Sequence, residues 1–309
     1  MQYGSINTAS TNSRDSSFAP QENLPDDKAL RRLISVTIAV VCLIAALFES
    51  SSSANEELSL PLPPMSSVFK PVDKFSSPHW KTYGDISEIR EKDAEYSEAG
   101  GWWKVEGDKL LIAPKAKQDF WRKTYYEPIL VKDDGSFLYH IVPEKDLPAT
   151  IETSFSLTPK AQFDQAGIII RLDADHWIKT GIEVVDEQAR LSCVVTNGFS
   201  DWSTQHVSEP GIKIRVHLLP QHGGSFVVEA APRDTDEWSF IRIAHLSRNS
   251  NDGSLNDNKE VKNSFHGESA QPGTLMVGVF AACPVDQKGM VATFDSISIT
   301  KGSAFVHDA

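Results

Sequence analysis

From residue 102 to residue 300, short segments in which apolar and polar residues alternate at every second position recur along the chain. This alternation is typical of β-strands, because successive side chains of a strand point to opposite faces of a sheet. Turn sequences such as Asp134-Gly135 and Asn197-Gly198 separate the segments. No segment of helical period exceeds about three turns outside the N-terminal region. We therefore predict an all-β domain in which two packed sheets form a jelly-roll sandwich.

The predicted strands are Trp102 to Glu106, Lys109 to Ala113, Phe137 to Val142, Ala149 to Leu157, Ala166 to Leu172, Trp177 to Asp186, Arg190 to Thr196, Ser203 to Val207, Ile212 to Pro220, Ser225 to Ala230, Ser239 to His245, Thr274 to Ala282 and Val291 to Thr300.

An uncharged apolar run, LISVTIAVVCLIAALF, occupies residues 33–48. It is slightly shorter than the roughly 17 to 25 residues of a typical transmembrane helix, and flanking residues can extend it by a turn. Basic residues precede the run and acidic residues follow it, so the positive-inside rule places the N-terminus in the cytoplasm and the β domain in the lumen or outside the cell. The alternative is a signal peptide cleaved near Ser52 to Ala54, which would release a secreted domain.

These patterns predict a domain plan. Residues 1–30 form a disordered cytoplasmic tail, residues 31–49 a transmembrane helix, and residues 50–74 a Ser- and Pro-rich stalk. Residues 75–301 form the sandwich, and residues 302–309 a C-terminal tail. A polar stretch at residues 247–272 interrupts the strand rhythm; such a long loop is either functional or a disordered insertion, and its lack of apolar residues favours disorder.

The charge of the chain limits the classes of partner that it can bind, and its cysteines limit the possible disulfides. The net charge of −12 lies entirely after residue 48, and no basic run is present. An acidic domain repels phosphate backbones, which argues against nucleic acid and suits a cation or a neutral sugar. The histidines are scattered singly, so we expect no metal site and no cofactor. Cys193 and Cys283 either form one disulfide or remain two buried thiols.

The central strands carry a family resemblance. AGIIIRLDADHWIKTGIEVVD from Ala166, RLSCVVTNGFSDWST from Arg190, MVGVFAACP from Met276 and ATFDSISI from Ala292, together with QDFWRKT from Gln118, resemble the regulation-of-enolase-like proteins. That family is a domain of unknown function within the concanavalin A-like lectin and glucanase superfamily. The resemblance covers roughly residues 75–300 and implies a concanavalin A-like jelly roll, without an established catalytic mechanism. The predicted membrane anchor departs from the family plan and conflicts with a cytosolic role in controlling a glycolytic enzyme.

One face of the predicted sheet carries polar and aromatic residues that are candidates for a binding or catalytic site. In the strand from His176, alternation places Trp177, Lys179 and Glu183 on one face and the core residues Ile178 and Ile182 on the other. If the preceding strand pairs across the turn at Asp173 to Asp175, Arg171 joins the polar face. Gly167 and Gly181 are expected to leave room above the sheet, as a groove would require.

In concanavalin-type sandwiches the concave sheet commonly holds the sugar, with aromatic rings stacked on it and carboxylates bound to its hydroxyls. The residues expected to line such a groove are Trp121, Arg171, Trp177, Lys179, Glu183, Asp201 and Trp202. The competing interpretation is that this face has only a structural role. Glu183 would then form salt bridges with Lys179 and Arg171, and the tryptophans would cover the edge of the sheet.

Three functions remain open. The leading hypothesis is a membrane-anchored, non-catalytic module that binds carbohydrate or another partner. The second is a glycan-active hydrolase or lyase using Glu183, although the strand lacks the Glu-x-Asp-x-x-Glu pattern of the glucanases and needs a second carboxyl group about 5 to 9.5 Å away. The third is a protein-binding regulator of a metabolic enzyme, which requires exposure to the cytosol.

The predicted topology has a direct test. In sealed membrane vesicles that keep the cytoplasmic face outward, the β domain should resist added protease because it lies inside. The N-terminal tail should be removed under the same conditions. Immunoblotting against both ends measures this, and detergent should abolish the protection. Digestion of the β domain in intact vesicles would contradict the topology and admit a cytosolic partner.

Overall fold

The computed structural model describes residues 71–78, 80–89, 100–209, 211–220, 224–247, 268–285 and 289–306. These residues form seventeen β-strands and one short 3₁₀ turn, η1 (Glu144–Asp146). The predicted membrane segment at residues 33–48 lies outside the described residues, as do the tail and all but the last few residues of the stalk. Within the described part of the chain, no helix is long and apolar enough to span a bilayer.

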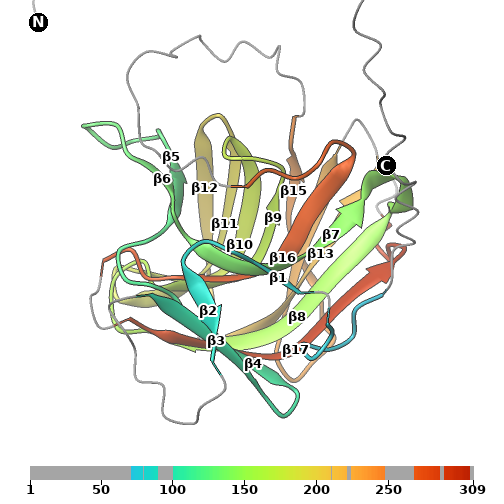
Figure 1. Cartoon of the computed structure of the whole chain (residues 1–309), viewed down its shortest axis with the longest axis horizontal. Coiled ribbons are helices and arrows are strands. Elements are labelled where there is room, and N and C mark those ends of the chain that lie inside the picture. The colour runs from blue at the N-terminus through green and yellow to red at the C-terminus, as the bar shows by residue number, and fades with distance from the viewer. Residues whose placement is uncertain are drawn as a thin grey trace, which may run out of the picture. The chain divides into compact units, whose positions relative to one another are not determined.

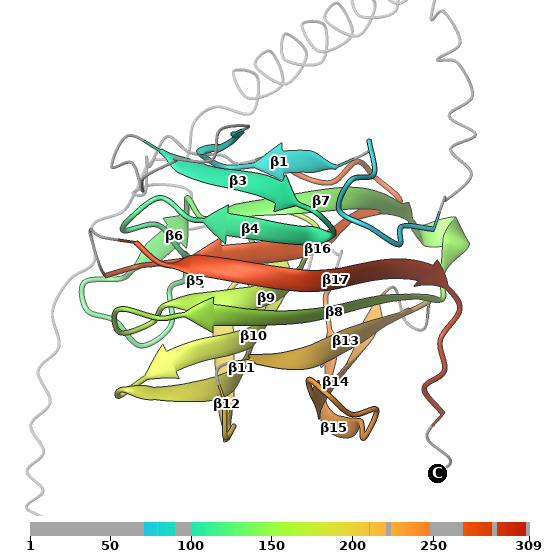
Figure 2. The same ribbon diagram turned by 90° about the horizontal axis from the view of Figure 1, so that it is seen from below.

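Two antiparallel sheets face each other (Figure 1). The seven-stranded sheet has the order β1 (Lys81–Tyr83), β7 (Ser136–Pro143), β16 (Thr274–Ala282), β9 (Gln165–Arg171), β10 (His176–Val185), β11 (Gln188–Asn197) and β12 (Ser200–His206). The eight-stranded sheet has the order β15 (Ser239–His245), β14 (Ser225–Pro232), β13 (Gly211–Leu219), β8 (Ala149–Thr158), β17 (Val291–Lys301), β4 (Lys109–Ala113), β3 (Gly101–Glu106) and β2 (Ile86–Glu88); only β2 and β3 are parallel. In Figure 2 the eight-stranded sheet lies in front of the other sheet.

The two inner faces enclose one large apolar core. Along β8 the burial alternates without exception from Ala149 to Leu157, as the period-two pattern predicts. Phe155 stacks on Phe294 of β17 with ring centroids 5.4 Å apart. The all-β sandwich is thus confirmed, and every predicted strand overlaps an observed one. Val72 already pairs with Ile299, so the sandwich includes residues before Phe75. Cys193 and Cys283 are buried free thiols and form no disulfide with each other.

Sequence reasoning missed four strands: β1, β2, β5 (Phe120–Arg122) and β6 (Val131–Asp133). Each has only three residues, which is too short to show an alternating pattern. β5 and β6 pair with each other in a separate two-stranded sheet. This β5–β6 hairpin stands against the outer face of the seven-stranded sheet (Figure 1).

Glycines permit close contact between neighbouring strands of the seven-stranded sheet. Gly167 and Gly181 are directly paired, and a Cβ atom on either would lie 2.0 Å from a carbonyl oxygen of the adjacent strand. A Cβ on Gly278 would lie 1.8 Å from the Leu138 carbonyl oxygen. We expected Gly167 and Gly181 to leave room for a groove. In the structure they are instead needed because the backbones of neighbouring strands lie too close for a Cβ atom at either position.

Substituting Gly278 tests this requirement. We expect Gly278→Ala to lower the free energy of unfolding by about 3 kcal/mol, because the backbone of β7 has to move. Gly100→Ala is the control: its Cβ would meet the end of the Asp85 side chain at 3.3 Å, so its cost should stay below about 1 kcal/mol. Denaturant titration measures both values. Equal costs would contradict the explanation.

Candidate functional site

The pairing of β9 with β10 brings the predicted polar face together. Trp177 lies opposite Arg171, and Glu183 lies opposite Gln165. The same register places Ile178 and Ile182 in the core between the sheets, as predicted. However, every residue from Trp177 to Val184 is buried, so both faces of β10 are covered.

The cover over the polar face is the β5–β6 hairpin. Phe120 of β5 is fully buried and packs against Trp177, Phe137 and Tyr83, with ring centroids 5.8 to 6.1 Å away. Gly135 makes room for this ring, because a Cβ there would lie 2.3 Å from a Phe120 ring carbon. These aromatic residues form a second apolar cluster outside the main core.

Arg171 is the most deeply buried charge on this face. Its two terminal nitrogens donate to the two carboxylate oxygens of Asp133, at 2.6 and 3.0 Å. The Tyr83 hydroxyl donates to the same carboxylate at 3.1 Å, and the guanidinium stacks 4.7 Å from the Tyr83 ring centroid. Burial raises the pKa of Tyr83, so its phenol stays protonated and remains a donor. The expected partnership of Arg171 with Glu183 is replaced by one with the hairpin.

A second ion pair joins the hairpin to β10. The Lys179 ammonium donates to Asp119 Oδ1 at 2.7 Å, and Gln165 Nε2 donates to the same oxygen at 3.2 Å. Lys179 is almost fully buried. Its principal partner is thus Asp119, not Glu183 as the structural interpretation expected.

Glu183 lies beside this pair in an environment that favours its neutral form. Its Oε2 accepts a hydrogen bond from Ser192 Oγ at 2.6 Å, and Ser192 Oγ in turn accepts one from Trp202 Nε1 at 2.9 Å. Burial raises the pKa of Glu183 to about 7, against the lowering effects of Lys179 and the Ser192 hydrogen bond. The carboxyl group therefore titrates near neutral pH.

A partly exposed aromatic surface surrounds Glu183 and Lys179. We call Trp121, Tyr125, Tyr126, Phe163 and Trp202 the aromatic surface; neighbouring rings within it have centroids 5.3 to 6.3 Å apart. Tyr125 is 89% exposed and Tyr126 is 37% exposed. Burial and the carboxyl groups of Asp119 and Glu183 raise the pKa of Tyr126.

The seven predicted residues thus fall into three places. Trp121, Lys179, Glu183 and Trp202 converge at the aromatic surface. Arg171 and Trp177 are enclosed beneath the hairpin, with less than 2% of either exposed. Asp201 points to the other face of β12 and pairs with Arg242 of β15 at 3.0 Å. That these seven residues bind a ligand stays a prediction.

Sequence reasoning missed Tyr125, Tyr126 and Phe163. The run Thr124-Tyr125-Tyr126-Glu127-Pro128 carried a signal, because two adjacent aromatic residues in a polar connection between strands have no core position to fill. Phe163 has no such signal, since it is a single aromatic residue in a turn between strands.

The acidic turn before β10 is a local hydrogen-bonded structure. Asp173 Oδ1 accepts from the Asp175 backbone N–H and contacts His176 Nδ1, both at 2.8 Å. Within the ranges that the structure covers, no cluster of three His, Cys, Asp or Glu side chains has the geometry to hold a metal ion.

Comparison with known proteins decides the family. Residues 96–302 match the family described as "Protein of unknown function (DUF1349)". The chain belongs to this family. It is also 38% identical over 139 residues to regulation of enolase protein 1 of Saccharomyces cerevisiae, covering 45% of this chain and 67% of that protein. The family resemblance found in the sequence is confirmed.

Two further relatives agree. An uncharacterized protein of Emericella nidulans is 27% identical over 197 residues, which cover 62% of this chain and 86% of that protein. The crystal structure of a functionally unknown protein from Saccharomyces cerevisiae superposes with a TM-score of 0.51 at 27% identity, covering 65% of this chain and 92% of the other. The crystal structure supports the fold, and the descriptions of these relatives name no ligand.

The environment of Glu183 predicts a pH dependence of stability. Because its folded-state pKa is raised from 4.5 to about 7, the native state holds this proton longer than the unfolded chain does. Its contribution to stability is therefore full at acidic pH and falls as the pH rises from about 4.5 to about 7. Between pH 5 and pH 8 the loss should be about 2 kcal/mol.

Glu183→Gln removes this titration. Unfolding free energies of both proteins at pH 5 and pH 8 should show that the variant gains about 2 kcal/mol relative to the wild type at the higher pH. Glu187→Gln, on the exposed turn after β10, is the control and should show no such gain. A pH-independent difference between wild type and Glu183→Gln would show that Glu183 is ionised in the native state throughout.

Proposed function

We propose that this protein is a non-catalytic carbohydrate-binding module that is held at a membrane by residues 33–48. The observation that carries the binding function is the aromatic surface beside the buried Glu183 and Lys179 and the partly buried Asp119. Aromatic rings bind the apolar faces of sugar rings, while their shape and rigidity keep the entropic cost of binding low.

The orientation of the indoles supports a stacking role. Trp202 Nε1 donates to Ser192 Oγ, and Trp121 Nε1 donates to the Thr124 carbonyl oxygen at 3.0 Å. Internal hydrogen bonds therefore hold both rings in place, and their exposed carbon surfaces remain for a ligand. Because the domain is acidic, a neutral oligosaccharide fits this surface better than a sulfated or uronic-acid glycan.

The β5–β6 hairpin covers the carboxyl groups, and this favours a binding role over a catalytic one. Glu183 is 6% exposed and its neighbour Asp119 is tied to Lys179. A hydrolase or lyase using Glu183 would need the hairpin to move before a substrate could reach the carboxyl group. An exposed aromatic surface can bind a sugar without such a movement.

Binding to a panel of neutral oligosaccharides tests the proposal. We expect the full-length chain to bind, and Tyr125→Ala and Tyr126→Ala each to weaken the affinity by about tenfold through loss of ring contact. Isothermal titration calorimetry measures the affinities. Phe240→Ala is the matched control, because Phe240 is 52% exposed on the other sheet. Binding that is equally strong in all three variants would overturn the proposed surface.

A protein-binding role is the second candidate, and it rests on the relative named regulation of enolase protein 1. This role requires the β domain to face the cytosol if the partner is a cytosolic enzyme. The vesicle experiment described above separates the two, because protection of the domain from protease excludes a cytosolic partner.

A further inference from the structure

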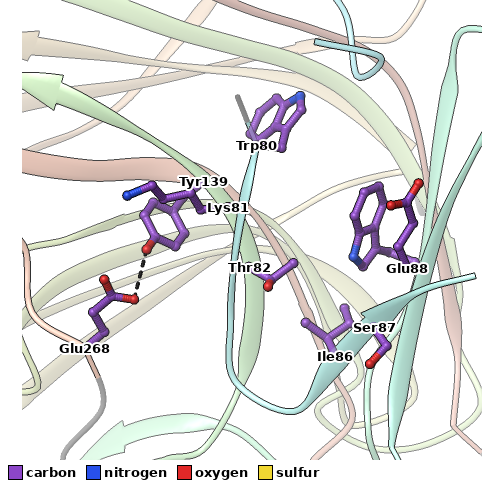
Figure 3. Close-up of a pocket in the computed structure, with 9 residues that line it drawn as sticks. Trp80, Lys81, Thr82, Ile86, Ser87, Glu88, Tyr139 and Glu268 are labelled. Atoms are coloured by element: carbon purple, nitrogen blue, oxygen red, sulfur yellow. Dashed lines mark hydrogen bonds between the residues drawn. The ribbon is translucent and has the colours of Figure 1, made fainter. Parts of the chain in front are cut away.

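A separate pocket lies at the other end of the seven-stranded sheet from the aromatic surface. β1 forms one edge of that sheet, β12 forms the opposite edge, and the chain passes directly from β1 to β2 at the edge of the eight-stranded sheet. The pocket has a volume of about 560 Å³, within the range that small-molecule sites occupy. It is lined by Trp80, Lys81, Thr82, Ile86, Ser87, Glu88, Trp103, Tyr139 and Glu268 (Figure 3).

Two partly buried indoles contribute to the walls. Trp80 is held by stacking on Phe75, with ring centroids 6.1 Å apart, and by an edge contact with His140 at 4.2 Å. Trp103 lies on β3, directly opposite Glu88 of β2. The ring contacts of Trp80 and the strand position of Trp103 place both residues at the pocket wall.

Two carboxylates face the same space. The Tyr139 hydroxyl donates to Glu268 Oε2 at 3.0 Å and orients that carboxylate (Figure 3). Burial and the hydrogen bond to Glu268 raise the pKa of Tyr139, so this phenol stays protonated and remains a donor to that carboxylate. Glu88 is exposed and forms no ion pair with any residue that the structure describes.

Lys81 is the one cation among the described lining residues, and it forms no ion pair with the Glu88 or the Glu268 carboxylate. It is exposed, and in Figure 3 its side chain extends past Tyr139, away from Glu88. The pocket therefore combines indole walls with a net negative charge.

We propose that this pocket binds a small organic cation, an alkylammonium or guanidinium group. A cation is attracted both to the faces of indole rings and to carboxylates, whereas an anion would be repelled by Glu88 and Glu268. A cation–π contact at a partly exposed site is weak by itself, so affinity depends on the indoles and the carboxylates together. This site is independent of the carbohydrate surface.

Choline and its uncharged isostere 3,3-dimethyl-1-butanol provide a matched pair of probes, with propylguanidinium as a second cation. Titration calorimetry of the full-length chain at low salt should show that both cations bind, and that the alcohol binds at least about tenfold more weakly. Glu88→Gln and Trp103→Ala should each weaken choline binding by about the same factor. Added salt should weaken it further, because exposed charges are screened.

Glu237→Gln is the control, since Glu237 is an exposed carboxylate outside the pocket without an ion pair to any described residue. Equal affinities for choline and the alcohol, or equal effects of Glu88→Gln and Glu237→Gln, would overturn the proposal. Loss of choline binding in Tyr125→Ala would place the cation at the aromatic surface and also overturn it. Oligosaccharide binding that survives Glu88→Gln separates this site from the proposed function.

Discussion

The buried charge of Arg171 is the constraint on which the outer layer of this domain depends. A guanidinium without any solvent exposure is stable only when its hydrogen bonds and charge are matched. Asp133 supplies both oxygens, and it does so from β6, outside the seven-stranded sheet. The β5–β6 hairpin therefore has to lie against this sheet. This position brings Phe120 onto Trp177 and Asp119 to Lys179. Removing either member of the pair would leave a buried charge uncompensated and release the hairpin.

The β5–β6 hairpin, which forms a third layer on the seven-stranded sheet, determines where ligands can reach that sheet. The centre of the outer face, where Arg171 and Trp177 lie, is filled by side chains of the hairpin. Two regions stay accessible: the aromatic surface, which the hairpin itself forms together with β12, and the pocket beside β1. The first combines exposed rings with a titrating carboxyl group, and the second combines indoles with two carboxylates that form no ion pair with a described residue. Their different chemistry supports the assignment of different ligands to them.

The membrane anchor proposed for residues 33–48 bears on the meaning of the family relationship. Residues 96–302 belong to a family whose function is unknown, and a relative in that family is named for regulation of enolase. A domain displayed on the far side of a membrane would meet glycans and small extracellular or lumenal solutes instead of a glycolytic enzyme. The shared fold does not choose between these roles, because one fold supports unrelated functions.

The sequence by itself determined thirteen of the seventeen described strands, the core-facing residues of the central strands, and the family. Period-two alternation is a local property, so β8 and β10 could be predicted with the correct face toward the core. The same alternation made Lys179 and Glu183 look exposed, because a polar residue on a strand usually faces solvent.

Only the tertiary structure decided that this face is covered. The partners that cover it are distant in sequence: 38 residues separate Asp133 from Arg171, and 60 separate Asp119 from Lys179. β5 and β6 are too short to be recognised, and no local pattern connects Trp80, Trp103 and Glu268 to one pocket. Local periodicity reports how a residue is oriented within its own strand. Which segment packs on the strand depends on contacts formed only when the whole chain folds.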